Sequence, residues 1–189
     1  MLRNAAWPDG IVRPATPDDL PALAGLCAAH AAFEQAGPVP GDLADRLEPA
    51  LFRAPARVWC LVADCGGELL GYATYTLEFS TWLAAEYVHL DCLFVAERHR
   101  GGGWGRRLLD AVTAAATARG MTQVQWQTPD WNNDAIRFYD RTGAQSARKV
   151  RYLLPVPAVQ EKNDLDGSVN SRNQLSPALR LGGGMGELE

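Results

Sequence analysis

Apolar residues recur along the chain with two periods, one typical of strands and one typical of helices. Runs rich in β-branched and aromatic residues predict strands, and they cover residues 11–15, 57–63, 68–79, 86–95, 124–128 and 149–154. Apolar positions three or four residues apart predict helices, and these cover residues 16–36, 42–51, 106–118 and 134–141. The order β-α-α-β-β-β-α-β-α-β predicts a mixed α/β sheet flanked by helices.

Short polar and glycine-rich segments mark the ends of these elements. Thr16-Pro17-Asp18-Asp19 predicts a helix start, with threonine at the cap, proline at the first helical position and acids in the first turn. Gly37-Pro38 is expected to end this helix, and Arg119-Gly120 is expected to end the helix over 106–118. Gly66-Gly67 predicts a hairpin turn between two strands. The first helix is expected to face the core with Leu20, Leu23, Cys27 and Ala31.

A change in composition marks the end of the predicted domain. With 189 residues the chain is long enough for one domain with a sizeable core. Beyond Pro155 the residues become polar and rich in glycine, which is typical of a tail. We therefore expect a domain over residues 1–154. Residues 155–189 are expected to form a tail, ordered by contact with a second copy of the chain or with a neighbour in a crystal.

The charge and the cysteines exclude several classes of function. A formal net charge of -4 gives no general attraction for nucleic acid or for an anionic membrane, so neither is an expected partner. The cysteines lack the paired spacing of zinc or redox sites, which predicts reduced, buried thiols and no bound metal. The first residues lack a signal-peptide pattern, and no apolar run approaches the ~20 residues of a membrane span. A cytoplasmic location is therefore expected.

The stretch from His89 to Leu109 carries the clearest sign of chemistry. An apolar strand is followed by a basic turn, four glycines in five positions and an amphipathic helix. Glycines let a backbone approach an anion closely, and the amides at a helix start attract phosphate. No lysine follows as a P-loop requires, and the spacing differs from the dinucleotide fingerprint. The stretch therefore predicts a site for the phosphates of a cofactor.

The pattern that does fit is Arg-x-x-Gly-x-Gly, formed by Arg100, Gly103 and Gly105. It resembles the acyl-CoA loop of the GCN5-related N-acetyltransferases, the GNAT family. Further matching pieces lie in order between residues 11 and 154, and they are IVRPAT (11–16), FE (33–34), CLVA (60–63), FSTW (79–82), LDCLFV (90–95), DWNN (130–133), FY (138–139) and GA (143–144). Together they are most similar to the diamine (spermidine/spermine) acetyltransferase branch. The resemblance implies the GNAT fold, a mixed and mostly antiparallel sheet that splays apart after the fourth strand.

The resemblance implies acetyl-CoA as the cofactor. Its pyrophosphate would bind the loop residues Arg100, Gly101, Gly102, Gly103, Trp104, Gly105 and Arg106. Its pantetheine arm would bind the backbone of Leu93, Phe94 and Val95 at an open strand edge, where an amide can also polarise the thioester carbonyl. Asn132, Asn133 and Ala135 complete the implied cofactor site. Two plainer interpretations stay open, namely a solvated basic face for the arginines and an ordinary core strand for residues 93–95.

The resemblance also assigns acid–base chemistry to two residues. Tyr139 matches the general acid of the family, which protonates the departing thiolate of coenzyme A. Asp91 matches the acidic residue that draws a proton from the acceptor ammonium through ordered water, and it is one methylene shorter than the usual glutamate. The alternatives are structural. The last helix is expected to bury Ile136 and either Tyr139 or Phe138, so Tyr139 could be a core residue. Asp91 could pair with an arginine or with His89.

The amine site of the diamine branch is matched by Glu34, Trp82, Asp91 and Asn132. A carboxylate and an indole both suit a cation. Where that branch has further acids, this chain has Ser80 and the basic segment 146–149. The loss of two acids and the gain of cations disfavour a long polycation. The expected acceptor is therefore an amine with a nearby neutral or anionic end, such as an amino acid.

These observations predict an N-acetyltransferase. It would transfer an acetyl group from acetyl-CoA to the primary amine of a small molecule, diamine-like or amino-acid-like, by direct attack in a ternary complex. Two alternatives stay open, which are a protein or peptide N-acetyltransferase and a non-catalytic acyl-CoA-binding module. The implied branch is dimeric, so a homodimer is expected.

Overall fold

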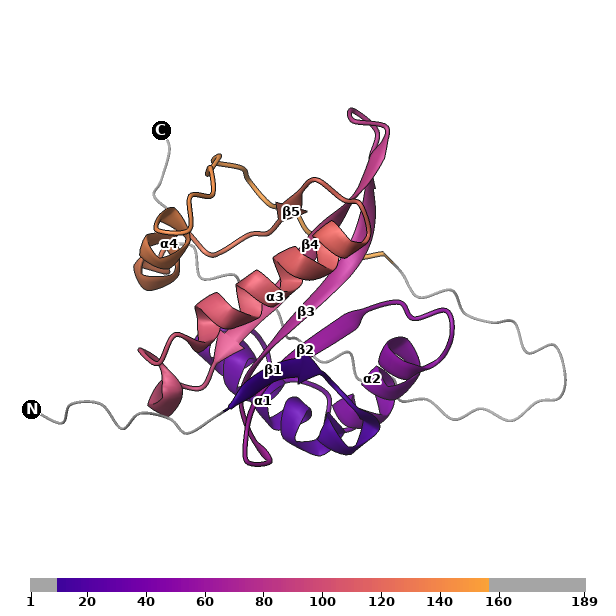
Figure 1. Ribbon diagram of the computed structural model, residues 1–189, viewed down its shortest axis with the longest axis vertical. Helices are drawn as coiled ribbons and strands as arrows, with labels where there is room; N and C mark the ends of the chain where they lie inside the picture. Colours follow the sequence, from indigo (N-terminus) through magenta and orange to yellow (C-terminus); the bar gives the residue numbers. More distant parts are fainter. Residues whose placement is uncertain (1–9, 157–189) are drawn as a thin grey trace, which may run out of the picture. The chain divides into compact units, whose positions relative to one another are not determined.

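The computed structural model describes residues 10–156, and residues 1–9 and 157–189 lie outside the described part (Figure 1). The described residues divide into two compact units, residues 10–127 and residues 128–156. The tail predicted over residues 155–189 falls almost entirely outside the described residues, so its ordering by a second copy stays a prediction.

The first unit contains the predicted sheet and three of the predicted helices. Its elements are β1 (Ile11–Pro14), a 3-10 turn (Pro17–Asp19), α1 (Leu20–Phe33), α2 (Leu43–Phe52), β2 (Trp59–Cys65), β3 (Glu68–Ser80), β4 (Ala85–Val95), a second 3-10 turn (Glu97–His99), α3 (Trp104–Ala118) and β5 (Val124–Gln125). The predicted order of these elements is confirmed.

The five strands form one sheet in the order β1-β2-β3-β4-β5. The first four strands pair antiparallel, and β5 pairs parallel with β4. The β4–β5 register contains only the pairs Val88↔Val124 and His89↔Gln125. Among residues 10–156, β4 therefore runs on to Val95 with no further strand on that side. This confirms the predicted mixed sheet that splays apart after its fourth strand.

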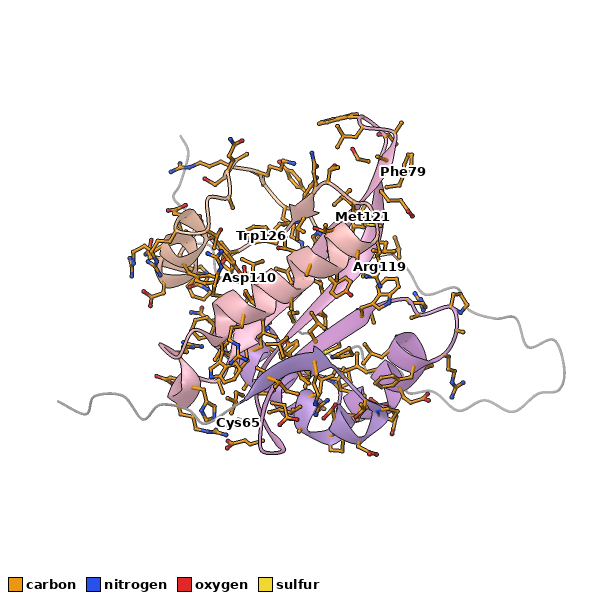
Figure 2. The ribbon with its side chains drawn as sticks, in the orientation of Figure 1. Cys65, Phe79, Asp110, Arg119, Met121 and Trp126 are labelled. Atoms are coloured by element: carbon orange, nitrogen blue, oxygen red, sulfur yellow. The ribbon has the colours of Figure 1, made fainter. Side chains whose placement is uncertain are left out.

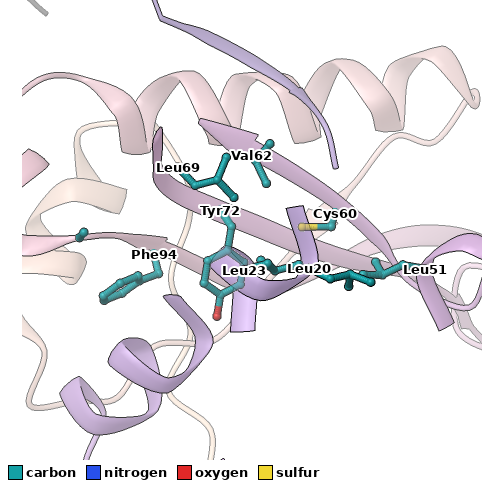
Figure 3. Packing of buried hydrophobic residues seen from close by; sticks show 9 residues of the cluster. Leu20, Leu23, Leu51, Cys60, Val62, Leu69, Tyr72 and Phe94 are labelled. Atoms are coloured by element: carbon teal, nitrogen blue, oxygen red, sulfur yellow. The ribbon is translucent and has the colours of Figure 1, made fainter. Parts of the chain in front are cut away.

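Helices cover both faces of the sheet. On one face α3 packs against β2, β3 and β4, and its Leu108 and Val112 are fully buried. On the other face α1 and α2 pack against each other, and Leu23 of α1 and Leu51 of α2 join Tyr72 of the sheet in one apolar cluster (Figure 3). Of the candidate acceptor residues, Glu34 lies on this second face, at the end of α1.

A buried ion-pair network joins β1 to the start of α1 and to β2. The Arg13 guanidinium donates to Asp19 at 2.7 and 2.8 Å and to Asp64 at 2.9 Å. The Thr16 amide and hydroxyl also donate to Asp19, at 2.7 and 3.0 Å. These hydrogen bonds, with those from Arg13 the strongest, outweigh the effect of burial and lower the pKa of Asp19 to about 2. The helix start predicted at Thr16 is confirmed.

Replacing Asp19 with asparagine is expected to lower the free energy of unfolding by about 2 kcal/mol near neutral pH. The pKa of Asp19 is lower in the folded protein than in the unfolded chain. Its contribution is therefore complete above about pH 4 and is lost as the pH falls toward about 2. Urea unfolding at both ends of this range measures the difference. Asp18→Asn, at an exposed neighbour, is the matched control and should be neutral. An equal loss at both pH values would mean that the charge of Asp19 is not responsible.

The second unit contains one helix, α4 (Asn133–Asp140), which confirms the helix predicted over 134–141. The prediction that Ile136 and either Tyr139 or Phe138 are core residues is wrong, because no α4 side chain is buried and these three are half-buried. A helix of eight residues in a small unit has few neighbours to cover its apolar side.

The strand predicted over residues 149–154 is also wrong. Residues 144–156 form no strand, and the Val150, Tyr152 and Leu154 side chains are exposed. Strand propensity is not sufficient here, because a strand forms only where a neighbouring strand satisfies its backbone.

All four cysteines lie in the described part of the chain and are free thiols, as predicted. The prediction that they are buried holds for Cys60 alone, because the other three are half-buried. Burial is the main cause that raises the pKa of the Cys60 thiol to about 12. Within residues 10–156 no helix has both the length and the apolar character needed to cross a membrane.

Candidate active site

A bulge in β4 carries the predicted catalytic acid. Thr74 pairs with Cys92 and Tyr75 pairs with Leu90, so Asp91 has no counterpart on β3. Such a bulge bends the strand and redirects the side chain of the extra residue. Asp91 is exposed, and its Oδ2 accepts a hydrogen bond from the Cys92 thiol at 3.6 Å. No salt bridge to Asp91 is found among residues 10–156, so the predicted alternative of an ion-paired aspartate has no support in this part of the chain.

Glu34 lies at the end of α1, where the backbone turns sharply. Gln35 has a φ of 57°, and the Ala36 amide donates to the Ala31 carbonyl at 2.9 Å. This is a Schellman arrangement, and it ends the helix at Phe33, before the predicted end at Gly37-Pro38. The Glu34 carboxylate lies 3.4 Å from Nε2 of His30, one helical turn earlier.

His30 connects Glu34 to the sheet. Its Nδ1 lies 3.0 Å from the Tyr72 hydroxyl on β3, and its ring stacks on Phe94 of β4 with the centroids 4.9 Å apart. Figure 3 shows Tyr72 and Phe94 on this face, with the Tyr72 hydroxyl directed away from the sheet. We call His30, Glu34, Asp91 and Cys92 the acceptor cluster. His30 did not emerge from the sequence, because a single histidine in an apolar helix matches no motif. Its spacing from Glu34 was the one available signal.

The open edge of β4 is formed by Leu93, Phe94 and Val95, beyond the last pair with β5. The Phe94 side chain is buried and its two neighbours are half-buried, so these side chains belong to the core, while no strand of residues 10–156 pairs with the outer backbone edge. Arg100 lies against this edge. Its Nε donates to the Val95 carbonyl at 3.1 Å, and its guanidinium lies 4.5 Å from the centre of the Phe33 ring.

The glycine loop leads directly into α3. Gly101 and Gly103 adopt φ values of 81° and 79°, which glycine reaches without strain. A β-carbon at either position would meet no atom within 4 Å, so the loop is open on that side. The amides of residues 104–106 begin the helix and have no intrahelical acceptor. The loop therefore fits the phosphates of acetyl-CoA, because an anion can approach these amides closely.

The arginines beside the loop already have partners. Arg98 pairs with Glu68 at 2.7 Å, and Arg106 pairs with Asp110 at 2.8 Å. The second pair is exposed and of the i,i+4 type, worth only about 0.3–0.5 kcal/mol, so a phosphate can compete for Arg106. The Arg107 guanidinium lies 4.2 Å from the centre of the Trp104 ring, and the Trp104 side chain is buried. Only the backbone of Trp104 is therefore available to a cofactor.

The predicted residues of the second unit lie on α4 or directly before it. Asn132 is buried, and its Oδ1 accepts from the Ala135 amide at 3.2 Å, so it caps the helix that Asn133 begins. Tyr139 lies near the end of the same helix, with its ring centroid 5.1 Å from that of Phe138. The Tyr139 carbonyl accepts from the Thr142 amide at 2.9 Å and from its hydroxyl at 2.6 Å. These bonds fix the backbone on which the Tyr139 hydroxyl is carried.

In the first unit the structure brings Glu34 and Asp91 into the acceptor cluster and leaves Trp82 apart. Trp82 lies in the turn between β3 and β4 and is 95% exposed. The stretch of β4 from Ala85 to Asp91 places this turn about 20 Å from the bulge. Figure 2 shows Phe79, close to the same turn, at the far end of the hairpin. The substrate-binding role of Trp82 stays a prediction.

Comparison with known proteins gives both a family and relatives. Residues 27–144 match the model of the acetyltransferase (GNAT) family. L-ornithine N5-acetyltransferase of Arabidopsis thaliana is 33% identical over 81 residues, which is 43% of this chain and 36% of that protein. Thialysine N-epsilon-acetyltransferase of Mus musculus is 32% identical over 94 residues, which is 46% of this chain and 55% of that protein. The matched region thus spans between a third and about half of these two relatives.

The fold is also found in solved structures. The crystal structure of an aminoglycoside acetyltransferase from an uncultured soil metagenomic sample superposes with a TM-score of 0.64 and 19% sequence identity. The match covers 78% of this chain and 96% of that chain. At this identity the likeness extends to the fold alone.

Proposed function

Because the chain belongs to the acetyltransferase (GNAT) family, we propose that it transfers an acetyl group from acetyl-CoA to the primary amine of a small molecule. The acceptor is proposed to be amino-acid-like. The named relatives acetylate ornithine and thialysine, which are amino acids with a side-chain amine. The diamine branch has acids where this chain has Ser80 and the segment 146–149. Their absence also favours an amino-acid-like acceptor over a diamine.

The bulge in β4 is the observation that best supports the proposal. The bulge presents the carboxylate of Asp91 two residues before the open backbone edge that begins at Leu93. A proton acceptor for the amine and an edge for the amide-rich arm of acetyl-CoA are thus carried by one strand. That juxtaposition is what acetyl transfer in a ternary complex requires, because the two substrates must meet at one point.

The donor is proposed to bind through backbone groups. The amides of residues 101–106 would hold its pyrophosphate, with Arg100 and Arg106 supplying positive charge. The edge of residues 93–95 would bind its pantetheine arm, and an amide there would polarise the carbonyl that is attacked. When bound, acetyl-CoA supplies a thioester whose acetyl group is transferred. Asn132, Asn133 and Ala135, in the second unit, are proposed to bind the donor on the basis of the family resemblance.

Asp91 and Tyr139 are proposed to move the protons. The acceptor arrives as an ammonium ion, and Asp91 takes one proton from it through water, which leaves the nitrogen able to attack. The carbon–nitrogen bond forms as the carbon–sulfur bond breaks. As the carbon–nitrogen bond forms, the nitrogen becomes cationic and gives a second proton to solvent. Tyr139 gives its proton to the departing sulfur and regains one from solvent, so that one proton is released for each amide formed.

A panel of amines and amino acids tests the proposal, with acetyl-CoA as donor and thiol release as the readout. Ornithine and lysine analogues are expected to be acetylated in preference to spermine. Efficient turnover of spermine with none of lysine analogues would overturn the amino-acid-like acceptor. Transfer to peptides alone would identify a protein acetyltransferase. Tight binding of coenzyme A with no transfer to any amine would identify a non-catalytic binding module.

A homodimer is also proposed, from the resemblance to the dimeric diamine branch. Light scattering coupled to size-exclusion chromatography measures the mass in solution, and a monomer would contradict the proposal. The cytoplasmic location stays a prediction.

A further inference from the structure

His30 holds the carboxylate of Glu34 from inside the protein. The His30 side chain is only 13% exposed, whereas that of Glu34 is 38% exposed and can be reached by a substrate. The His30 ring uses both of its nitrogens, with Nδ1 at the Tyr72 hydroxyl and Nε2 at Glu34. Its stack on Phe94 fixes the plane of the ring. The acceptor cluster therefore contains a buried imidazole of fixed orientation behind a carboxylate that is predicted to meet the amine.

The groups around His30 favour its charged form. Burial favours the neutral ring, but the Cys92 sulfur and the Glu34 carboxylate, which lies 3.4 Å from Nε2, outweigh burial and raise the pKa of His30 to about 9. Other titratable groups face this region, with Tyr72 on β3, Cys27 on α1, and Asp91 beside Cys92 on β4. Burial is the main cause that raises the pKa of the Tyr72 hydroxyl, so it stays neutral. Arg100 lies beyond the Phe94 ring, 5.7 Å from its centre.

The two carboxylates of the acceptor cluster differ in whether they are paired with a cation. The Glu34 carboxylate is paired with an internal cation, whereas Asp91 has no salt bridge within residues 10–156. A second ammonium on the acceptor would have to share Glu34 with His30. A substrate with a neutral or anionic second end meets no such competition.

We propose that His30 is a specificity-determining residue, whose charge neutralises Glu34 and thereby selects amino-acid-like acceptors over diamines. This inference rests on the proposed acetyl transfer to a small amine. It differs from a purely structural role, in which His30 would only fill space between α1 and the sheet.

Two acceptors that differ only in a carboxylate test the inference. Ornithine and 1,4-diaminobutane have the same chain of carbons between their amines, and the ratio of their kcat/KM values is the readout. His30→Gln keeps hydrogen-bonding groups but removes the charge, and it is expected to shift this ratio about tenfold toward the diamine. Glu34→Gln leaves the charge of His30 unpaired, and it is expected to shift the ratio toward ornithine. In the double variant the two effects should largely cancel.

The outcomes separate this inference from the proposed function. If the wild-type enzyme acetylates both acceptors and His30→Gln leaves their ratio unchanged, the role of His30 is overturned while acetyl transfer stands. If the wild-type enzyme acetylates neither acceptor, the proposed function fails for this substrate class. An NMR titration reads the charge of His30 without using activity, and the spectrum of His30→Gln assigns its signal among the three histidines. A ring that is neutral near pH 7 would overturn the inference even if the variants were too unstable to assay.

Discussion

Replacing Tyr139 with phenylalanine is expected to lower kcat about 100-fold and to leave the Kd of coenzyme A unchanged. The change removes one oxygen and keeps the ring, which is half-buried on α4 beside Phe138. The backbone at this position is held by Thr142 and by the Asn132 cap, neither of which the substitution touches. A loss of kcat with an unchanged Kd of coenzyme A would therefore report the missing proton donor rather than a displaced helix.

The measurement combines steady-state thiol release with calorimetric titration of coenzyme A. Tyr152→Phe is the matched control, because Tyr152 lies in the same unit, is 89% exposed and has no proposed role. An unchanged kcat in Tyr139→Phe would show that Tyr139 is not the general acid. If coenzyme A bound much more weakly, Tyr139 would belong to the donor site and not to proton transfer.

Replacing Asp91 with asparagine is expected to lower kcat/KM for the amine about 100-fold near neutral pH. Asparagine has nearly the same shape but accepts no proton from an ammonium ion. The acceptor would then react only through its free-amine fraction, which grows as the pH approaches about 10. The rate of the variant should therefore rise more steeply with pH than that of the wild-type enzyme.

Two further variants isolate the cause. Asp91→Glu restores a carboxylate with the longer side chain usual in the family and is expected to retain most of the activity. Asp45→Asn on α2, at an exposed position with no proposed role, is the matched control. If Asp91→Asn had the wild-type pH profile, Asp91 would serve only to stabilise the bulge.

Local signals predicted most of the first unit. The Gly66-Gly67 turn and the Gly120 helix end both occur where expected, and all three glycines have a positive φ. The cap at Thr16 and the helix beginning near Asp42 also lie where the sequence placed them. These features succeed because each depends on a few neighbouring residues, whose conformational preferences are readable in sequence.

Features that depend on distant partners were predicted less well. Residues 149–154 have strand-forming side chains but form no strand, and β5 is limited to Val124–Gln125. α1 ends at Phe33 because Gln35 adopts a left-handed conformation that a non-glycine residue rarely takes. In each case the outcome depends on backbone partners or turn geometry that propensity does not encode.

The candidate site likewise combines features that the sequence predicted with features that only the structure revealed. The sequence by itself determined the glycine loop before α3 and the family resemblance, because both depend on short runs of contiguous residues. Only the tertiary structure decided that Asp91 is the extra residue of a bulge, that His30 joins Glu34 to Tyr72, and that Trp82 is exposed in the turn between β3 and β4. The physical reason is that strand register and helix-to-sheet packing are set by contacts between segments far apart in the chain. A shift of one residue in the pairing of β3 with β4 would move Asp91 to a different face, and that pairing is set by the packing of both strands and their turn rather than by the residues next to Asp91.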